Sequence, residues 1–195
     1  MFYKIFSIVY EKAAGRMAND CRDFIGKGDR ILDLGCGSAI VAKKFERFFQ
    51  AEVAGIDIVD NRVEKIDFKL FDGRALPFED KSFDDVLIAY VLHHCQEPLM
   101  TLSEAKRVAR KRIIVYEDLP DGWWGKIRCK IHGNLFNIFF QKNRAQCKFL
   151  DQKGWEKVFK ELGLNPIFEK KVSLPFELRK KDSSSWKNFD FLLRI

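Results

Sequence analysis

The sequence has no long hydrophobic run, no paired cysteines and no internal repeat. No stretch reaches the roughly 18 uninterrupted apolar residues that cross a bilayer, so no membrane-spanning helix is expected. The 5 cysteines are odd in number and never form a C-x-x-C pattern. Neither a disulfide framework nor a zinc or other metal site is therefore indicated, and reduced thiols fit a cytoplasm.

The first residues are only superficially like a secretion signal. The apolar core between Lys4 and Glu11 is very short. We therefore expect a cytoplasmic protein. A chain of 195 residues with 47% apolar content can bury one substantial core, and we expect one domain over residues 1–195.

The net charge of +7 is concentrated in the last part of the chain. Residues 1–119 carry 19 Lys and Arg against 20 Asp and Glu, whereas residues 120–195 carry 16 against 8. A basic portion of this kind favours an anionic partner such as nucleic acid, a phospholipid surface or an acidic metabolite. The charges are dispersed, so a solvated face of Lys-rich helix and loop explains them equally well.

Residues 30–42, RILDLGCGSAIVA, predict a strand, a tight turn and the start of a helix. Apolar residues flank Asp33, and Gly35 and Gly37 follow at a spacing of two. Glycine reaches positive φ without a Cβ clash and lets the backbone lie against a ligand. The stretch is therefore typical of a cradle for a nucleotide-type cofactor.

Two further acids follow later apolar runs. Asp57 ends the run over residues 53–56, and Asp72 follows the run over residues 67–71. A carboxylate at the tip of a second strand is placed to accept both ribose hydroxyls of an adenosine. Asp72 is then placed to accept from an adenine amino group.

Six segments in a fixed order carry a family resemblance. They are Asp33-Leu-Gly-Cys-Gly-Ser38, Gly55-Ile-Asp57-Ile58, Asp72-Gly-Arg-Ala-Leu-Pro-Phe78, Asp80-Lys-Ser-Phe-Asp84, Val91-Leu-His-His94 and Gly154-Trp-Glu156. With this order and spacing over residues 30–175, the chain resembles the S-adenosylmethionine-dependent methyltransferases of the Rossmann-like class I. It is nearest to their ubiquinone/menaquinone-biosynthesis-like (type 11) branch.

The resemblance implies an α/β fold and a methyl transfer to a small molecule. The fold would be a seven-stranded, mostly parallel sheet in the order 3-2-1-4-5-7-6, with the last strand antiparallel and helices on both faces. The cofactor would be S-adenosylmethionine and its product S-adenosylhomocysteine. The residues expected to bind it are Asp33, Gly35, Cys36, Gly37, Asp57, Ile58, Asp72, Gly73, Ala89, Tyr90 and Tyr10.

The resemblance also assigns roles to segments. Asp33 and the glycine turn would hold the amino-acid end of the cofactor, Asp57 the ribose, and Asp72 with Gly73 the adenine. Residues 1–26 would form a helical lid, and residues 118–150 a helical insert over the acceptor pocket. The residues expected to line that pocket are His94, Trp123, Trp124, His132, Phe136 and Phe140. This aromatic and basic insert could also lie at a lipid surface or stack on bases.

Apolar runs and turn residues place the elements. Strands are expected near residues 31–34, 52–57, 67–71, 83–89, 113–117, 165–174 and 186–193, and helices over 2–25, 38–49, 97–109 and 151–163. The link between the second and third strands is short, so its crossover helix is expected to be cut to about one turn. Basic residues 110–112 are expected in a loop before the fifth strand.

His93 and His94 are the candidates for acid–base catalysis, because imidazole changes charge near neutral pH. Either could instead be a packed or capping histidine before the next helix. A sulfonium methyl group is already activated, so alignment of the nucleophile and exclusion of water can suffice. The catalytic residues therefore stay open.

Three alternatives stand beside the small-molecule methyltransferase. An RNA or protein methyltransferase would use the basic C-terminal portion, although the chain lacks an Asn-Pro-Pro-Tyr-like segment and a Pro-Cys nucleophile. An NAD-dependent oxidoreductase is disfavoured because Ile40 stands where the dinucleotide fingerprint has its third glycine. A non-catalytic, methyltransferase-like binding protein is the third, because Ala39 replaces the last glycine usual in the family.

The enzyme hypothesis predicts that Asp57→Ala abolishes cofactor binding with no change in thermal stability.

Overall fold

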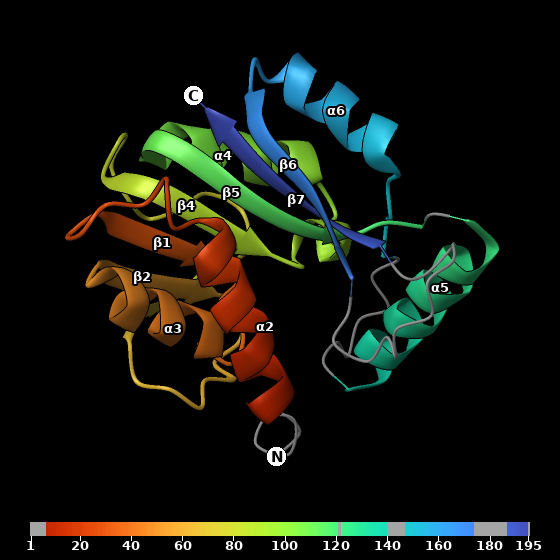
Figure 1. Cartoon of the computed structure of the whole chain (residues 1–195), viewed down its shortest axis with the longest axis horizontal. Coiled ribbons are helices and arrows are strands. Elements are labelled where there is room, and N and C mark those ends of the chain that lie inside the picture. Colours follow the sequence, from red (N-terminus) through yellow and green to blue (C-terminus); the bar gives the residue numbers. More distant parts are fainter. Residues whose placement is uncertain (1–6, 121, 140–146, 174–186, 195) are drawn as a thin grey trace.

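The computed structural model describes residues 7–120, 122–139, 147–173 and 187–194 (Figure 1). Seven strands form one sheet in the order β3-β2-β1-β4-β5-β7-β6. They are β1 (Arg30–Leu34), β2 (Glu52–Asp57), β3 (Asp67–Leu70), β4 (Phe83–Ala89), β5 (Ala109–Asp118), β6 (Asn165–Ser173) and β7 (Lys187–Arg194). β1 to β5 pair in parallel, and β7 is antiparallel to both β5 and β6. The expected order and the antiparallel last strand are confirmed.

Helices lie on both faces of this sheet (Figure 1). They are α2 (Ser7–Asp20), α3 (Ile40–Phe49), α4 (Pro98–Val108), α5 (Gly122–Phe139) and α6 (Gln152–Glu161), with a short 3-10 helix η1 (Leu92–His94). Within the described ranges, none of them is long and apolar enough to cross a membrane. The expected α/β class is therefore confirmed.

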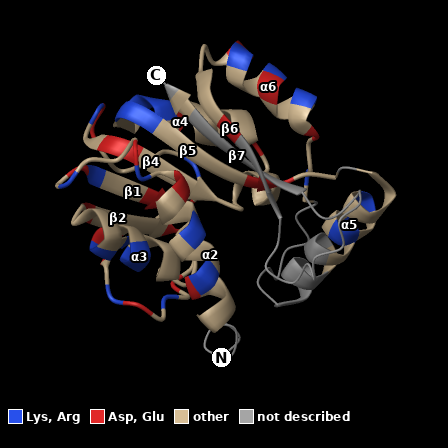
Figure 2. Cartoon of the chain, viewed as in Figure 1, with Lys and Arg blue, Asp and Glu red and all other residues tan. Residues whose placement is uncertain are grey.

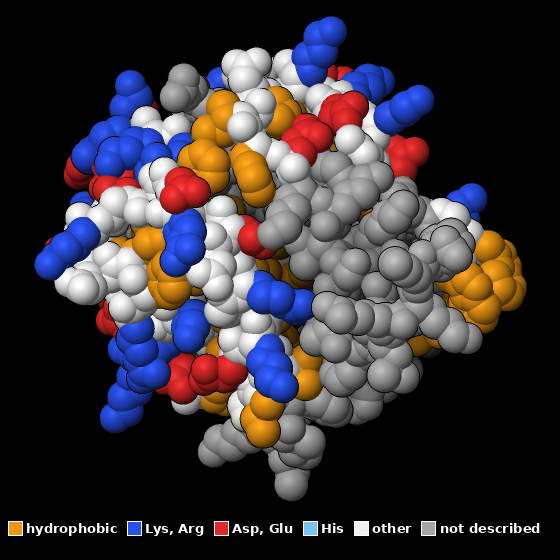
Figure 3. Space-filling view, in the orientation of Figure 1, with side chains coloured by type: hydrophobic (Ala, Val, Ile, Leu, Met, Phe, Trp, Pro, Cys, Tyr) orange, Lys and Arg blue, Asp and Glu red, His pale blue; other side chains and the backbone are white. Residues whose placement is uncertain are grey.

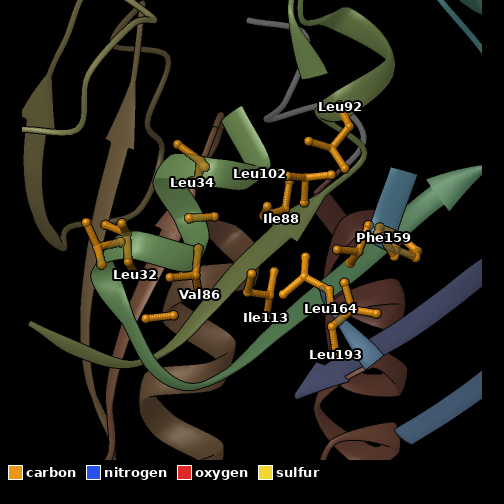
Figure 4. Close-up of a cluster of buried hydrophobic side chains, with 14 of the residues drawn as sticks. Leu32, Leu34, Val86, Ile88, Leu92, Leu102, Ile113, Phe159, Leu164 and Leu193 are labelled. Carbon is orange, nitrogen blue, oxygen red and sulfur yellow. The ribbon is translucent and has the colours of Figure 1, made fainter. Parts of the chain in front are cut away.

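The core consists of two apolar clusters, one on each face. Successive side chains of a strand point to opposite faces, so Ile31 packs with α2 and α3 while Leu32 packs on the other face with α4 and α6. Figure 4 shows the cluster that contains Leu32, to which Val86 and Ile113 of neighbouring strands and Phe159 of α6 also belong. The two clusters hold the central strands rigidly and bring the carboxyl ends of β1, β2 and β4 to one edge of the sheet.

The link from β2 to β3 has the expected length but contains no helix. Residues 58–66 contain no helical turn, so the predicted crossover turn is wrong. Local contacts hold this link instead: the backbone N–H of Val63 donates to Ser38 O at 2.9 Å, and the Arg62 guanidinium lies 4.0 Å from the centre of the Phe68 ring. The link therefore lies against the start of α3 without a helix of its own.

The basic residues 110–112 lie within β5, where the sequence had predicted a loop. Arg112 Nε lies 2.6 Å from Asp85 Oδ1, and Lys111 Nζ lies 2.8 Å from Asp29 Oδ1. Figure 2 shows basic and acidic segments side by side where β4 and β5 begin. These carboxylates neutralise the cations at the amino ends of the strands, which allows β5 to begin at Ala109.

We predict that Arg112→Leu lowers the free energy of unfolding by about 3 kcal/mol. Asp85 is 0% exposed, and the substitution leaves its buried carboxylate without the guanidinium. Denaturant unfolding followed by circular dichroism measures the change. Arg47→Leu is the control, because the Arg47–Glu64 pair is largely exposed and its atoms are 4.0 Å apart. Equal effects of the two substitutions would contradict the prediction.

Candidate functional site

The turn after β1 connects the ends of two neighbouring strands. The backbone N–H groups of Gly35 and Cys36 donate to Ile56 O in β2, at 2.8 and 3.2 Å. Gly35 and Gly37 have φ values of 77° and 50°, which glycine adopts without strain. The strand, turn and helix predicted from residues 30–42 are confirmed, and the turn lies at the carboxyl edge of the sheet.

Gly35 also leaves no room for a side chain. A Cβ at this position would lie 2.5 Å from Val91 Cγ2. Val91 follows β4, so the segment after β4 closes directly over the turn. Gly35 therefore meets a conformational need and a packing need at once, whereas its positive φ is the reason for Gly37.

Ala39, which stands where the resembled family has its last glycine, has a backbone conformation that glycine favours. Its φ is 61°, in the left-handed region, and it is buried at the N-terminus of α3. Such a φ costs an alanine roughly 1 kcal/mol relative to glycine. The turn nevertheless keeps its geometry, because the backbone N–H of Ala39 donates to Cys36 O at 2.8 Å.

Asp33 is a buried carboxylate with an unsatisfied oxygen. Its side chain is 2% exposed, and Oδ2 has no hydrogen-bond partner among the described residues. Burial, and then the nearby charge of Asp57, raise the pKa of Asp33 to about 7. A buried acid without a partner for one oxygen is destabilising in itself. It is well placed to accept from a cationic ligand group.

Asp57 joins the two turns at the ends of β1 and β2. Its Oδ2 accepts from the backbone N–H of Gly37 at 2.8 Å, and its Oδ1 accepts from Ile58 N–H at 2.7 Å and Val59 N–H at 3.3 Å. Burial raises its pKa, against the lowering effect of these hydrogen bonds. Asp57 therefore has a structural role, which the sequence did not reveal.

The other residues predicted to bind the cofactor follow the ends of neighbouring strands. Asp72 is exposed, and its Oδ1 accepts from Arg74 N–H at 2.9 Å. Gly73 has φ 81°, and a Cβ there would lie 3.3 Å from the side chain of Ile58. The structure thus places Gly73 beside the end of β2.

The end of β4 is held in a rare conformation. Tyr90 has φ 60°, which is a strained value for a bulky residue. Its backbone N–H donates to Tyr116 O in β5 at 2.8 Å. Strain of this kind often accompanies function.

Three further residues predicted to bind the cofactor are wholly or partly buried. Ala89, the last residue of β4, and Tyr10 of α2 are half-buried, and burial raises the pKa of Tyr10. Burial likewise raises the pKa of the Cys36 thiol in the glycine turn.

The two histidines after β4 have different surroundings. His93 is fully buried, and its Nδ1 lies 2.5 Å from Glu117 Oε2. Burial alone lowers the pKa of His93, but the charge of Glu117, the hydrogen bond to Glu117 and the charge of Asp118 together outweigh burial and raise that pKa. His94 is half-buried, with Nδ1 3.2 Å from Cys147 Sγ. The structure thus makes His93 a core residue and leaves His94 nearer the surface.

Glu117 is the residue that the sequence analysis missed. It is 0% exposed at the end of β5, and its second oxygen accepts from Leu92 N–H at 2.8 Å. Glu117 thereby holds η1 against the sheet. A carboxylate ending the apolar run over residues 113–116 was a signal for such a role, because a buried charge requires partners.

Only two of the insert residues predicted to line the acceptor pocket have described side chains. Trp123 and Trp124 lie on α5 and are 66% and 58% exposed. His132 and Phe136 also belong to α5, but their side chains lie outside the described ones, and Phe140 lies outside the described residues. The structure therefore does not bring the two tryptophans into an enclosed pocket.

We predict that Asp33→Asn stabilises the protein in a pH-dependent way. The raised pKa of Asp33 means that ionisation is harder in the folded than in the unfolded protein, so wild-type stability falls as pH rises through about 7. Relative to wild type, the variant should gain roughly 2 to 3 kcal/mol between about pH 5 and pH 8. Urea unfolding at both pH values measures this gain. A difference independent of pH would contradict it.

We predict that Asp57→Ala lowers the free energy of unfolding by about 1 to 2 kcal/mol, because Gly37 N–H loses its acceptor. This revises the expectation of unchanged stability. Thermal unfolding of Asp57→Ala and of Asp60→Ala tests it, since Asp60 is exposed and bonds to Arg62 two residues away. A variant at Asp57 as stable as the one at Asp60 would contradict the structural role.

Comparison with known proteins identifies the fold. The family model described as "Methyltransferase domain" matches residues 32–116. The structure of a SAM-dependent methyltransferase from Archaeoglobus fulgidus superposes with a TM-score of 0.72 at 15% identity, covering 100% of both chains. Magnesium protoporphyrin IX methyltransferase from Synechocystis, solved with bound SAH, has a TM-score of 0.69 at 18% identity and covers 100% of this chain and 87% of that chain.

Some of the sequence relatives cover most of the chain. A demethylmenaquinone methyltransferase from Staphylococcus haemolyticus is 33% identical over an alignment 167 residues long, which covers 72% of this chain and 70% of the relative. The chain spans less than half the length of several other curated relatives that it matches, at 46%, 35% and 44%. With the glycine turn and the strand order described above, these matches show that the chain belongs to the class I S-adenosylmethionine-dependent methyltransferases, in the type 11 branch.

Proposed function

We propose that this chain binds S-adenosylmethionine and transfers its methyl group to a small-molecule acceptor. The observation that carries the proposal is that Oδ2 of buried Asp33, two residues before the glycine turn, has no hydrogen-bond partner among the described residues. A cationic amino group satisfies such an oxygen, and a backbone free of side chains admits a ligand at short range. The residues present therefore fit the cofactor.

The proposed roles follow the strand ends. Asp33 accepts from the amino group of the cofactor, with Gly35, Cys36 and Gly37 as the adjoining backbone. Asp57, with Ile58 beside it, accepts from a ribose hydroxyl at the one lone pair of Oδ2 that its three backbone contacts leave. Asp72 and Gly73 bind the adenine edge, and Ala89 and Tyr90 form the floor.

Ala39 and the short crossover do not argue for a decayed site. Ala39 holds the left-handed conformation that the turn requires, and the link after β2 is bonded to Ser38. Both departures from the family pattern therefore leave the turn intact, which favours an active enzyme over a non-catalytic relative.

The cofactor supplies a methyl group already activated on a sulfonium, so the chain has to align an acceptor and exclude water. We propose that residues 1–26, with Tyr10, cover the cofactor and that residues 118–150 cover the acceptor. His94 borders the acceptor side. His93 is a positioning residue, because its buried pair with Glu117 holds η1 in place.

The acceptor class rests on the named relatives. They include enzymes whose names specify demethylmenaquinone and 27-O-demethylrifamycin SV, both small molecules. We propose an acceptor of this class for the present chain. The alternative, an RNA or protein acceptor, rests on the charge of residues 120–195 alone.

We predict that S-adenosylhomocysteine binds more weakly at low pH. Protonation of Asp33, whose pKa is about 7, removes the acceptor charge. The affinity of the chain for S-adenosylhomocysteine should therefore fall about tenfold between about pH 8 and pH 6. Isothermal titration calorimetry with S-adenosylmethionine, S-adenosylhomocysteine and NAD measures the affinities. Asp33→Asn is expected to bind the two sulfur compounds weakly and without this pH dependence.

Two outcomes would overturn the proposal. Binding of NAD in place of the sulfur compounds would make the chain an oxidoreductase. Failure of all three to bind a folded sample would favour the non-catalytic relative. If the cofactor binds, methyl transfer from labelled S-adenosylmethionine into an RNA preparation, with none into small-molecule extracts, would replace the acceptor class.

A further inference from the structure

Helix α5 exposes an aromatic surface that the sheet does not cover. Trp123 and Trp124 are 66% and 58% exposed, and their ring centres lie 4.4 Å apart in an edge-to-face arrangement. Ile131, two turns further along, is 53% exposed. Apolar side chains gather at the outer edge of the molecule over the beginning of α5 (Figure 3).

The opposite side of the same helix faces inward. Gly125 and Cys129 are buried, four residues apart and therefore on one face. A Cβ at Gly125 would lie 3.0 Å from the backbone of Pro120, so the helix is closely packed there. The exposure of the tryptophans is therefore a consequence of how α5 is anchored.

Basic residues flank the aromatic surface. Lys126 and Lys130 are exposed, whereas Arg128 turns inward, with Nη1 2.6 Å from Asp118 Oδ1 and Nη2 3.1 Å from Leu119 O. The sequence of α5 contains no Asp or Glu. The helix thus presents tryptophans and lysines on its solvent side, with no acid of its own beside them, and uses its arginine for internal bonding.

We propose that the α5 tryptophan face, formed by Trp123, Trp124, Lys126, Lys130 and Ile131, docks on an anionic phospholipid surface. Tryptophan prefers the bilayer interface, where its ring contacts acyl chains and its N–H stays hydrated. Lysines beside such an apolar face attract anionic headgroups. In place of the pocket-wall role expected from the sequence, the structure assigns the two tryptophans to this surface.

The charge pattern favours lipid over a protein partner. The cores of protein interfaces are depleted of lysine, whereas here Lys126 and Lys130 accompany both tryptophans within three turns of one helix. Single-stranded nucleic acid is the remaining partner for an aromatic and basic surface. Binding to single-stranded nucleic acid is therefore one of the outcomes that the test distinguishes.

The test is co-sedimentation of the whole chain with vesicles, without cofactor, so that its result is independent of methyl transfer. Vesicles of phosphatidylcholine with phosphatidylglycerol are expected to bind the chain, with a blue shift of tryptophan emission. Trp123→Ala combined with Trp124→Ala should weaken binding at least about tenfold and remove the shift. Lys126→Gln combined with Lys130→Gln should weaken binding about tenfold or more.

Matched variants control for a general loss of charge or apolar surface. Lys153→Gln with Lys160→Gln removes two exposed lysines of α6, and Ile8→Ala removes a 69% exposed apolar residue of α2. Both should bind vesicles as wild type does. Circular dichroism verifies that each variant is folded.

Three results would overturn the proposal. These are equal binding to pure phosphatidylcholine vesicles, equal losses in the α5 variants and their controls, and binding to single-stranded RNA with no binding to anionic vesicles. The last result would assign the same face to nucleic acid.

Discussion

The Asp57 carboxylate connects the two chain segments from which the proposed site is built. It accepts from Gly37 N–H in the turn after β1 and from Ile58 N–H after β2. Since Gly35 and Cys36 also donate to Ile56, the turn and the end of β2 form one bonded unit. The start of α3, the strained Ala39 and the buried Asp33 all adjoin this unit.

Buried carboxylates near the two ends of the strands differ in their partners. At the amino ends, Asp85 is paired with Arg112, and Asp29 is paired with Lys111. At the carboxyl ends, the described residues leave one oxygen of buried Asp33 unsatisfied. A buried acid of this kind costs stability. This loss of stability is located at the edge where open α/β sheets bind ligands, as a binding site requires.

Glu117 is a second buried acid, and unlike Asp33 it has partners for both oxygens. Glu117 bonds to His93 and to the backbone of Leu92, so the segment after β4 is held by β5. This segment supplies Val91, which closes over Gly35. The segment over the glycine turn is therefore positioned from β5, two strands away from β1, through the His93–Glu117 pair. No local sequence pattern links these two residues.

Local sequence accounts for the strands, the helices that follow them and the glycine turn. Apolar runs and the pair Gly35 and Gly37 act over a few residues, and the structure confirms the strands and the turn that they predict. The side chain of Asp151 caps α6 in the same local way. The long-range contacts could not be read in this way. Residues 110–112 looked like a loop because their neutralising carboxylates, Asp29 and Asp85, are distant in sequence. The pairing of Glu117 with His93, the exposure of Trp123 and Trp124, and the raised pKa of Asp33 likewise depend on what surrounds each side chain in space. Burial and electrostatics are properties of that surrounding, and the tertiary structure alone decides them.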